Sequence, residues 1–225
     1  MSENLTNNQY SNLAGPEPPF GGQGGLVAII KYNSGNVQSV QYALQRLGVE
    51  SVVTDDESVI RTANKVIFPG VGHAASAMQY LRDKELDKLI VSLQQPVLGI
   101  CLGQQLMCNH SEEGDTNCLG IFNEEVKLFV PPAGKVFKVP HVGWNSIYNL
   151  KSQLFKGLTK NDFVYSVHSY YTALGTDTAA TTDYIVPFSA SLQKDNFYAV
   201  QFHPEKSGLI GEIILKNFIS LLTMQ

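Results

Sequence analysis

Apolar residues in the first half of the chain form short uninterrupted runs, at residues 26–30, 66–68 and 97–98. Runs of this length without polar interruption are typical of parallel strands that are buried on both faces. Between the first two runs, apolar residues recur at helical spacing, namely Val37, Val40, Ala43, Leu44 and Leu47. Strands that alternate with helices predict the α/β class, with a doubly wound, mostly parallel sheet flanked by helices.

The second half of the chain has a different pattern. Residues 123–129, 138–145 and 162–171 alternate between apolar and polar positions, which predicts additional antiparallel strands. A closing segment at 209–219 is predicted to be an amphipathic helix packed on the core. Residues 1–25 are poor in apolar residues and rich in Asn, Gly and Pro, so we expect a flexible tail followed by one domain at 26–225.

Composition argues against nucleic-acid-binding, membrane-spanning and secreted classes of protein. The chain has 225 residues and a formal net charge of −4, which gives no electrostatic footprint for nucleic acid. It contains no apolar run long enough to span a membrane and no secretion signal at its N-terminus. Its three cysteines are not closely paired, which favours a reducing, cytoplasmic location over a disulfide framework.

One motif carries candidate chemistry. Gly99 and Gly103 flank Cys101, two residues away on each side, between the apolar run at 97–98 and a predicted helix start. This is the glycine-flanked nucleophile elbow, with Cys in the place of Ser, and a Cβ at either flanking position would collide with backbone. The helix N-terminus favours a thiolate, and the Leu102 N–H is placed to donate to an oxyanion. A buried structural cysteine in a strand-to-helix turn is the alternative.

A base and its orienting partner are found near the C-terminus. A cysteine nucleophile needs a base, and His203 can take the proton while Glu205 accepts from the other ring nitrogen. Pro204 biases His203 toward an extended backbone. Because residues two apart in an extended segment point the same way, we expect His203 and Glu205 to share a face.

Together, residues 99–103 and 203–205 resemble the class I (triad) glutamine amidotransferases, and the resemblance covers nearly all of the chain from Leu26 onward. It implies that a thioester on Cys101 forms during hydrolysis of the glutamine side-chain amide, and that ammonia is released. No cofactor and no metal are expected. Catalytic roles fall on Cys101, His203 and Glu205.

The loop at 69–72 follows another predicted strand, and on its own an ordinary β-turn would explain it. The resemblance instead implies that Val71 and Gly72 complete the oxyanion hole together with Leu102. Ligands of doubly wound sheets bind outside the carboxyl ends of the strands, where both this loop and the elbow are predicted to lie.

The family resemblance also implies a glutamine-binding set. Gln105 and Glu113 match positions that hold the substrate, and Ser169 and Tyr170 are candidates for contacting its carboxylate. The substrate's α-ammonium needs an anion and its carboxylate needs donors, so these residue types suit the task. A solvated loop is the alternative for Glu113.

Residues 139–145, 165–171 and 203–208 look like one subfamily, the glutaminase subunits of imidazole glycerol phosphate synthase. That likeness implies a heterodimer with a cyclase subunit, a (β/α)8 barrel that uses the ammonia in histidine biosynthesis. It places four residues at the partner interface, namely Asn33, Asn36, Trp144 and Lys206. The match departs at Lys31 and at His73, beside the oxyanion loop.

Three other functions remain open. The first is the glutaminase subunit of another class I amidotransferase, of the anthranilate or aminodeoxychorismate type. The second is a catalytically idle binding subunit of the same fold. The third is a cysteine peptidase or γ-glutamyl hydrolase. The tryptophan stretch around Trp144 argues against the first and the third, and the complete triad argues against the second.

Overall fold

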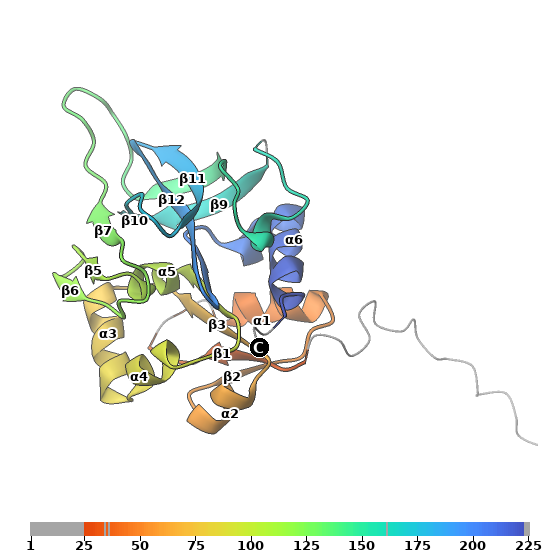
Figure 1. The fold of residues 1–225 in the computed structure, drawn as a ribbon. Helices are drawn as coiled ribbons and strands as arrows, with labels where there is room; N and C mark the ends of the chain where they lie inside the picture. Colours follow the sequence, from red (N-terminus) through yellow and green to blue (C-terminus); the bar gives the residue numbers. More distant parts are fainter. Residues whose placement is uncertain (1–24, 34, 36, 161, 223–225) are drawn as a thin grey trace, which may run out of the picture.

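The computed structural model describes residues 25–33, 35, 37–160 and 162–222, and a seven-stranded sheet forms its centre (Figure 1). Apart from Gly25, the predicted tail lies outside the described residues. Five strands of this sheet are parallel neighbours, in the spatial order β13 (Phe197–Val200), β4 (Val97–Cys101), β3 (Lys65–Gly70), β1 (Val27–Ile30) and β2 (Ser51–Thr54). Two antiparallel strands extend the β13 edge, β12 (Val186–Lys194) and then β11 (Thr178–Tyr184).

The continuous apolar runs form central strands because both faces of the sheet are covered. Along β1, Ala28 and Ile30 belong to one core cluster while Val27 and Ile29 belong to the other. The first cluster receives residues from α2 (Glu57–Thr62), α3 (Ala74–Asp83), α4 (Leu86–Val91) and α5 (Leu102–Met107). The second receives residues from α1 (Val37–Arg46) and α6 (Gly208–Ile219). Figure 1 shows α3 and α4 across the sheet from α6, so the predicted doubly wound architecture is confirmed.

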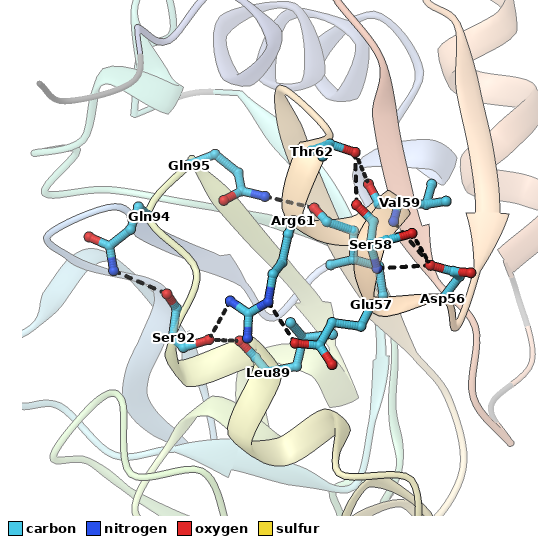
Figure 2. A network of polar contacts seen from close by, with 11 residues as sticks. Asp56, Glu57, Ser58, Val59, Arg61, Thr62, Leu89, Ser92, Gln94 and Gln95 are labelled. Atoms are coloured by element: carbon cyan, nitrogen blue, oxygen red, sulfur yellow. Dashed lines mark hydrogen bonds and ion pairs between the residues drawn. The ribbon is translucent and has the colours of Figure 1, made fainter.

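A polar network anchors the segment that leads into β4 (Figure 2). Asp56 caps α2 by accepting from the Ser58 amide at 2.8 Å, and Arg61 of the same helix donates to Ser92 Oγ at 3.0 Å. Gln95, just before β4, donates to the Ile60 carbonyl at 2.8 Å. The start of the strand that carries Cys101 is therefore tied to α2 by hydrogen bonds as well as by apolar packing.

Two smaller sheets lie beside the carboxyl edge of the main sheet. One contains β10 (Tyr170–Thr172), β7 (Glu125–Leu128), β5 (His110–Ser111) and β6 (Thr116–Asn117). The other pairs β8 (His141–Ser146) with β9 (Phe163–His168). The remaining elements are two 3₁₀ turns, η1 (Gln153–Phe155) and η2 (Pro204–Lys206). The predicted antiparallel strands of the second half are thus present, although β11 and β12 were not among them.

The helices are short relative to a lipid bilayer. In the ranges that the structure describes, none has both the length and the apolar character needed to cross a membrane. The closing helix α6 packs Ile214, Leu215 and Phe218 into the core, as predicted for residues 209–219.

Candidate active site

Cys101 is the last residue of β4 and lies immediately before α5, with φ 54° and ψ −108°. This left-handed region strains a residue that carries a Cβ, and such strain is concentrated at functional sites. Both flanking glycines lie in close packing, and the predicted collision of a Cβ with backbone is confirmed at Gly103. A Cβ on Gly103 would overlap the Phe68 carbonyl oxygen, and one on Gly99 would press against the Met107 sulfur. The turn therefore holds Cys101 at the carboxyl edge of the sheet.

His203 and Glu205 lie together beside this turn. The His203 Nδ1 and Glu205 Oε1 atoms are 2.8 Å apart, and the two side chains are 1% and 0% exposed. The predicted reason for their proximity was wrong. Glu205 lies in the 3₁₀ turn η2, not in an extended segment, and this turn brings its carboxylate back to the ring. Ser207 supports the turn by donating to the His203 carbonyl at 2.7 Å.

The protonation of His203 is set by its two neighbours. Burial alone lowers the pKa of His203, but hydrogen bonds to Cys101 and Glu205 outweigh burial and raise the pKa above its usual 6.5. The protonated ring is stabilised between a sulfur and a carboxylate, both of which can carry negative charge. A proton is therefore stored next to the position where a leaving group on a Cys101 adduct would depart.

The predicted oxyanion loop lies against the elbow. β3 and β4 pair in parallel with Gly70 opposite Cys101, and a Cβ on Gly70 would lie 2.9 Å from the Leu102 Cβ. Val71, Gly72 and Leu102 all line the pocket into which Cys101 opens. Gly72 has φ 126°, a conformation that favours glycine. The structure brings the three residues together, and their donor role stays a prediction.

The four predicted glutamine-binding residues line the same pocket, namely Gln105, Glu113, Ser169 and Tyr170. The Gln105 side-chain nitrogen donates to the Tyr170 carbonyl at 2.9 Å and to Gln201 Oε1 at 3.0 Å. Because an amide NH2 has two hydrogens, these bonds leave the Gln105 oxygen, an acceptor, for a ligand.

Glu113 also has a structural task. Its Oε2 accepts from the Ala74 amide at the start of α3, at 2.7 Å. His73 caps the same helix, with Nδ1 accepting from the Ala75 amide at 3.2 Å. Glu113 therefore joins its loop to α3, next to the oxyanion loop, and a carboxylate at a helix N-terminus is electrostatically favourable.

Gln201 was missed by the sequence analysis. It is 1% exposed, and its side-chain nitrogen lies 3.8 Å from Cys101 Sγ. It precedes His203 by two residues, a spacing that could have suggested a shared face. His168 also lines the pocket, and its Nδ1 lies 2.7 Å from the Tyr170 carbonyl oxygen.

Three of the predicted interface residues, Asn33, Trp144 and Lys206, do not line this pocket. Trp144, on β8, is 55% exposed, and Lys206 is exposed in η2 beside Glu205. Asn33 is exposed and donates to the Ser76 carbonyl at 3.3 Å, whereas Asn36 lies outside the described residues. Within those residues, no group of three or more His, Cys, Asp or Glu side chains is arranged to hold a metal ion.

Comparison with known proteins identifies the family. A family model described as glutamine amidotransferase class-I matches residues 28–221. Imidazole glycerol phosphate synthase subunit HisH of Bacteroides fragilis (strain YCH46) is 62% identical over 195 residues, covering 87% of this chain and 99% of that protein. The same-named protein of Shewanella loihica is 42% identical over 203 residues, covering 86% of this chain and 89% of its own length.

Solved structures agree on the fold. A glutamine amidotransferase from Thermotoga maritima superposes with a TM-score of 0.60 at 13% identity, covering 87% of this chain and 98% of that one. PurLQS from the same organism gives a TM-score of 0.64 at 16% identity, covering 87% and 97%. With the family model matching most of the sequence, the chain belongs to the class-I glutamine amidotransferase family.

Proposed function

We propose that this chain is the glutamine-hydrolysing subunit of an imidazole glycerol phosphate synthase. Relatives that carry this subunit name are 42% to 62% identical across most of the chain. The site brings together a thiol, an imidazole and a carboxylate, the groups that this kind of glutamine hydrolysis requires. The observation that carries the proposal is the strained Cys101 turn facing a buried His203 that is bonded to Glu205 at 2.8 Å.

The reaction follows from these positions. The Cys101 thiolate attacks the side-chain carboxamide of glutamine, and the N–H groups of Leu102 and the 71–72 loop stabilise the oxyanion, at roughly 3 kcal/mol per donor. His203 protonates the leaving ammonia and then takes a proton from the water that hydrolyses the thioester. Glu205 orients the ring and stabilises its positive charge. Glutamate and ammonia are the products.

The substrate's α-groups fit the opposite part of the pocket. The free oxygen of Gln105 and the carboxylate of Glu113 suit the α-ammonium, because both accept hydrogen bonds. The Ser169 and Tyr170 segment is proposed to hold the carboxylate. Glutamine is thereby fixed at its α-end while its amide reaches Cys101.

Ammonia must reach a second active site before water protonates it. We propose a (β/α)8 barrel cyclase as partner, in a one-to-one heterodimer. An exposed apolar strip supports this, formed by Val142 and Trp144 on β8 and Phe163 on β9, which are 57%, 55% and 51% exposed. Val142 pairs across the strands with Val167, which lines the pocket, so the strip borders the site that releases ammonia.

The test is Cys101→Ala in the complex with the cyclase. Glutamine-dependent turnover should fall to background, while turnover supplied with ammonium salts and binding of the cyclase should persist. Retained glutamine hydrolysis by this variant would remove Cys101 from the mechanism. Co-purification with a chorismate-using enzyme instead of a barrel cyclase would favour an anthranilate-type subunit.

A further inference from the structure

The side-chain amide of Gln201 lies between two residues of the proposed site. Its Oε1 accepts from Gln105 at 3.0 Å, and its Nε2 lies 3.8 Å from Cys101 Sγ. The backbone amide of Gln201 donates to the Ala190 carbonyl at 2.9 Å, which anchors the residue to β12. The side-chain amide of Gln201 is thus buried, and both its oxygen and its nitrogen contact residues of the proposed site.

The orientation of this amide follows from hydrogen-bond chemistry. The Tyr170 carbonyl can only accept, so the Gln105 amide must present its NH2 group to it, at 2.9 Å. The second hydrogen of that NH2 then points to Gln201, whose side-chain oxygen must accept it. The Gln201 NH2 is consequently directed at the Cys101 sulfur, and the alternative amide flip is excluded by the chain of bonds.

The Cys101 sulfur takes different hydrogen-bond partners in its two protonation states. A neutral thiol can donate, and the Val167 carbonyl oxygen lies 4.0 Å from Sγ. A thiolate can only accept, and the donors at hand are His203 and Gln201. An N–H bond to a charged acceptor is about twice as strong as one to a neutral acceptor.

We propose that Gln201 is a further catalytic residue, which donates its side-chain N–H to the thiolate form of Cys101 and links the sulfur to the substrate anchor Gln105. The inference rests on the proposed role of Cys101 as nucleophile. The 3.8 Å separation is long for such a bond, and catalytic hydrogen bonds of the free enzyme commonly tighten in the reacting complex.

The donor acts at two steps of the reaction. Before attack, it increases the fraction of Cys101 present as thiolate. When water hydrolyses the thioester, the water oxygen bonds to the acyl carbon, its proton passes to His203, and the electron pair of the broken C–S bond returns to sulfur. Gln201 then stabilises this leaving thiolate, so both formation and breakdown of the thioester gain from it.

The test compares alkylation of Cys101 by iodoacetamide, followed by peptide mass spectrometry across pH, in the wild type, Gln201→Glu and Gln201→Met. Glu keeps an acceptor for Gln105 and removes the donor to sulfur, while Met removes the donor without adding charge. Gln201→Met should move the midpoint of the alkylation profile about one pH unit higher, the expected size for one charge-assisted bond, and Gln201→Glu should move it further because its carboxylate also repels the thiolate. Glutamine turnover at neutral pH should fall roughly tenfold.

Gln104→Met is the matched control. Gln104 is also fully buried in α5, but its nitrogen donates to Thr172 Oγ1 and to the Ser189 carbonyl, each at 3.2 Å. This variant should keep the wild-type alkylation profile. The proposal is overturned if Gln201→Met also keeps the wild-type profile, or if Gln104→Met shifts the profile as far as Gln201→Met does. If Gln201→Met does not fold, an unshifted profile of Gln201→Glu overturns the proposal instead.

Alkylation needs no glutamine, which separates this inference from the proposed function. If the Gln201 variants shift the alkylation profile but the wild type does not hydrolyse glutamine, Gln201 is supported as a donor to the sulfur and the proposed glutaminase function is rejected.

Discussion

His203 and His168 are two buried histidines at the same edge of the molecule, and their pKa values move in opposite directions. Burial lowers the pKa of His168 from 6.5 to about 3, against a weaker raising effect of the Tyr170 carbonyl. Burial also lowers the pKa of His203, yet its bonds to Cys101 and Glu205 reverse the direction. The two rings are close enough for the charge of His203 to lower the pKa of His168 further.

The contrast shows that burial lowers the pKa of both rings, and that the partners of His203 are what reverse the direction there. His168 contacts a neutral carbonyl and aromatic rings, including Phe129 at a centroid separation of 5.5 Å. His168 therefore stays neutral in the wall of the pocket, whereas the raised pKa of His203 favours its protonated form. In stability terms, the raised pKa of His203 contributes below pH 6.5 and is lost as pH rises through that raised value, whereas the lowered pKa of His168 costs stability as pH falls below 6.5.

Glu205→Gln should have the largest effect, because it removes a negative charge that raises the pKa of His203 and has no counterpart beside His168. The pKa of His203 should fall, and the ring would lose its fixed tautomer. We expect kcat to drop roughly 10³- to 10⁴-fold, by analogy with other triads, in a glutamine hydrolysis assay with the cyclase present.

Glu212→Gln provides the control for this change. Glu212 makes a surface ion pair with Arg46 at 3.8 Å, and both side chains are partly exposed. Its loss should leave kcat unchanged. A similar drop in both variants would mean that Glu205 acts through general stability alone.

His168→Asn should flatten the acid side of the stability curve. Asn can still donate to the Tyr170 carbonyl but does not titrate. With a folded pKa of about 3 against 6.5 unfolded, His168 costs the wild type roughly 2 kcal/mol between pH 8 and pH 5. Urea unfolding at several pH values measures this difference, and an unchanged slope in the variant would show that His168 titrates normally.

His141→Asn should have the smallest effect of the three. Burial alone lowers the pKa of His141, whereas the charges of neighbouring histidines, including His203, lower the pKa of His168 further, and the His141 ring stacks on Tyr184 at a centroid separation of 4.0 Å. The acid-limb change in the same urea series should be a fraction of the His168 effect. An equal or larger change would show that His141 is the main acid-sensitive histidine of this site.

The parallel core of the fold was predictable because its signal is apolar continuity. β1, β3 and β4 are fully buried, so their sequences carry no polar alternation to confuse the pattern. β11 and β12 gave no such signal because they bury hydroxyl residues. Ser191 donates to the Ala199 carbonyl at 2.7 Å and Thr182 to the Ser146 carbonyl at 2.8 Å, so buried positions appear polar in the sequence.

The site was predictable where a motif fixes geometry locally. The glycines around Cys101 predict a tight turn. His203 and Glu205 are only two residues apart, so they lie close together whether the backbone is extended or forms a 3₁₀ turn. Gln201 was not predictable as a sulfur contact, because its orientation depends on Gln105 and on the Tyr170 carbonyl. These residues are distant in sequence, and only the folded sheet edge brings them together.

The left-handed backbone of Cys101 has a consequence for how this protein can change over time. Glycine adopts φ 54° without the penalty that a side chain incurs, which is of order 1–3 kcal/mol. Any lineage or library screened only for a well-folded product would therefore drift toward glycine at position 101 and lose the thiol. A cysteine at this position therefore costs stability, and a chemical role of its thiol is what would offset that cost.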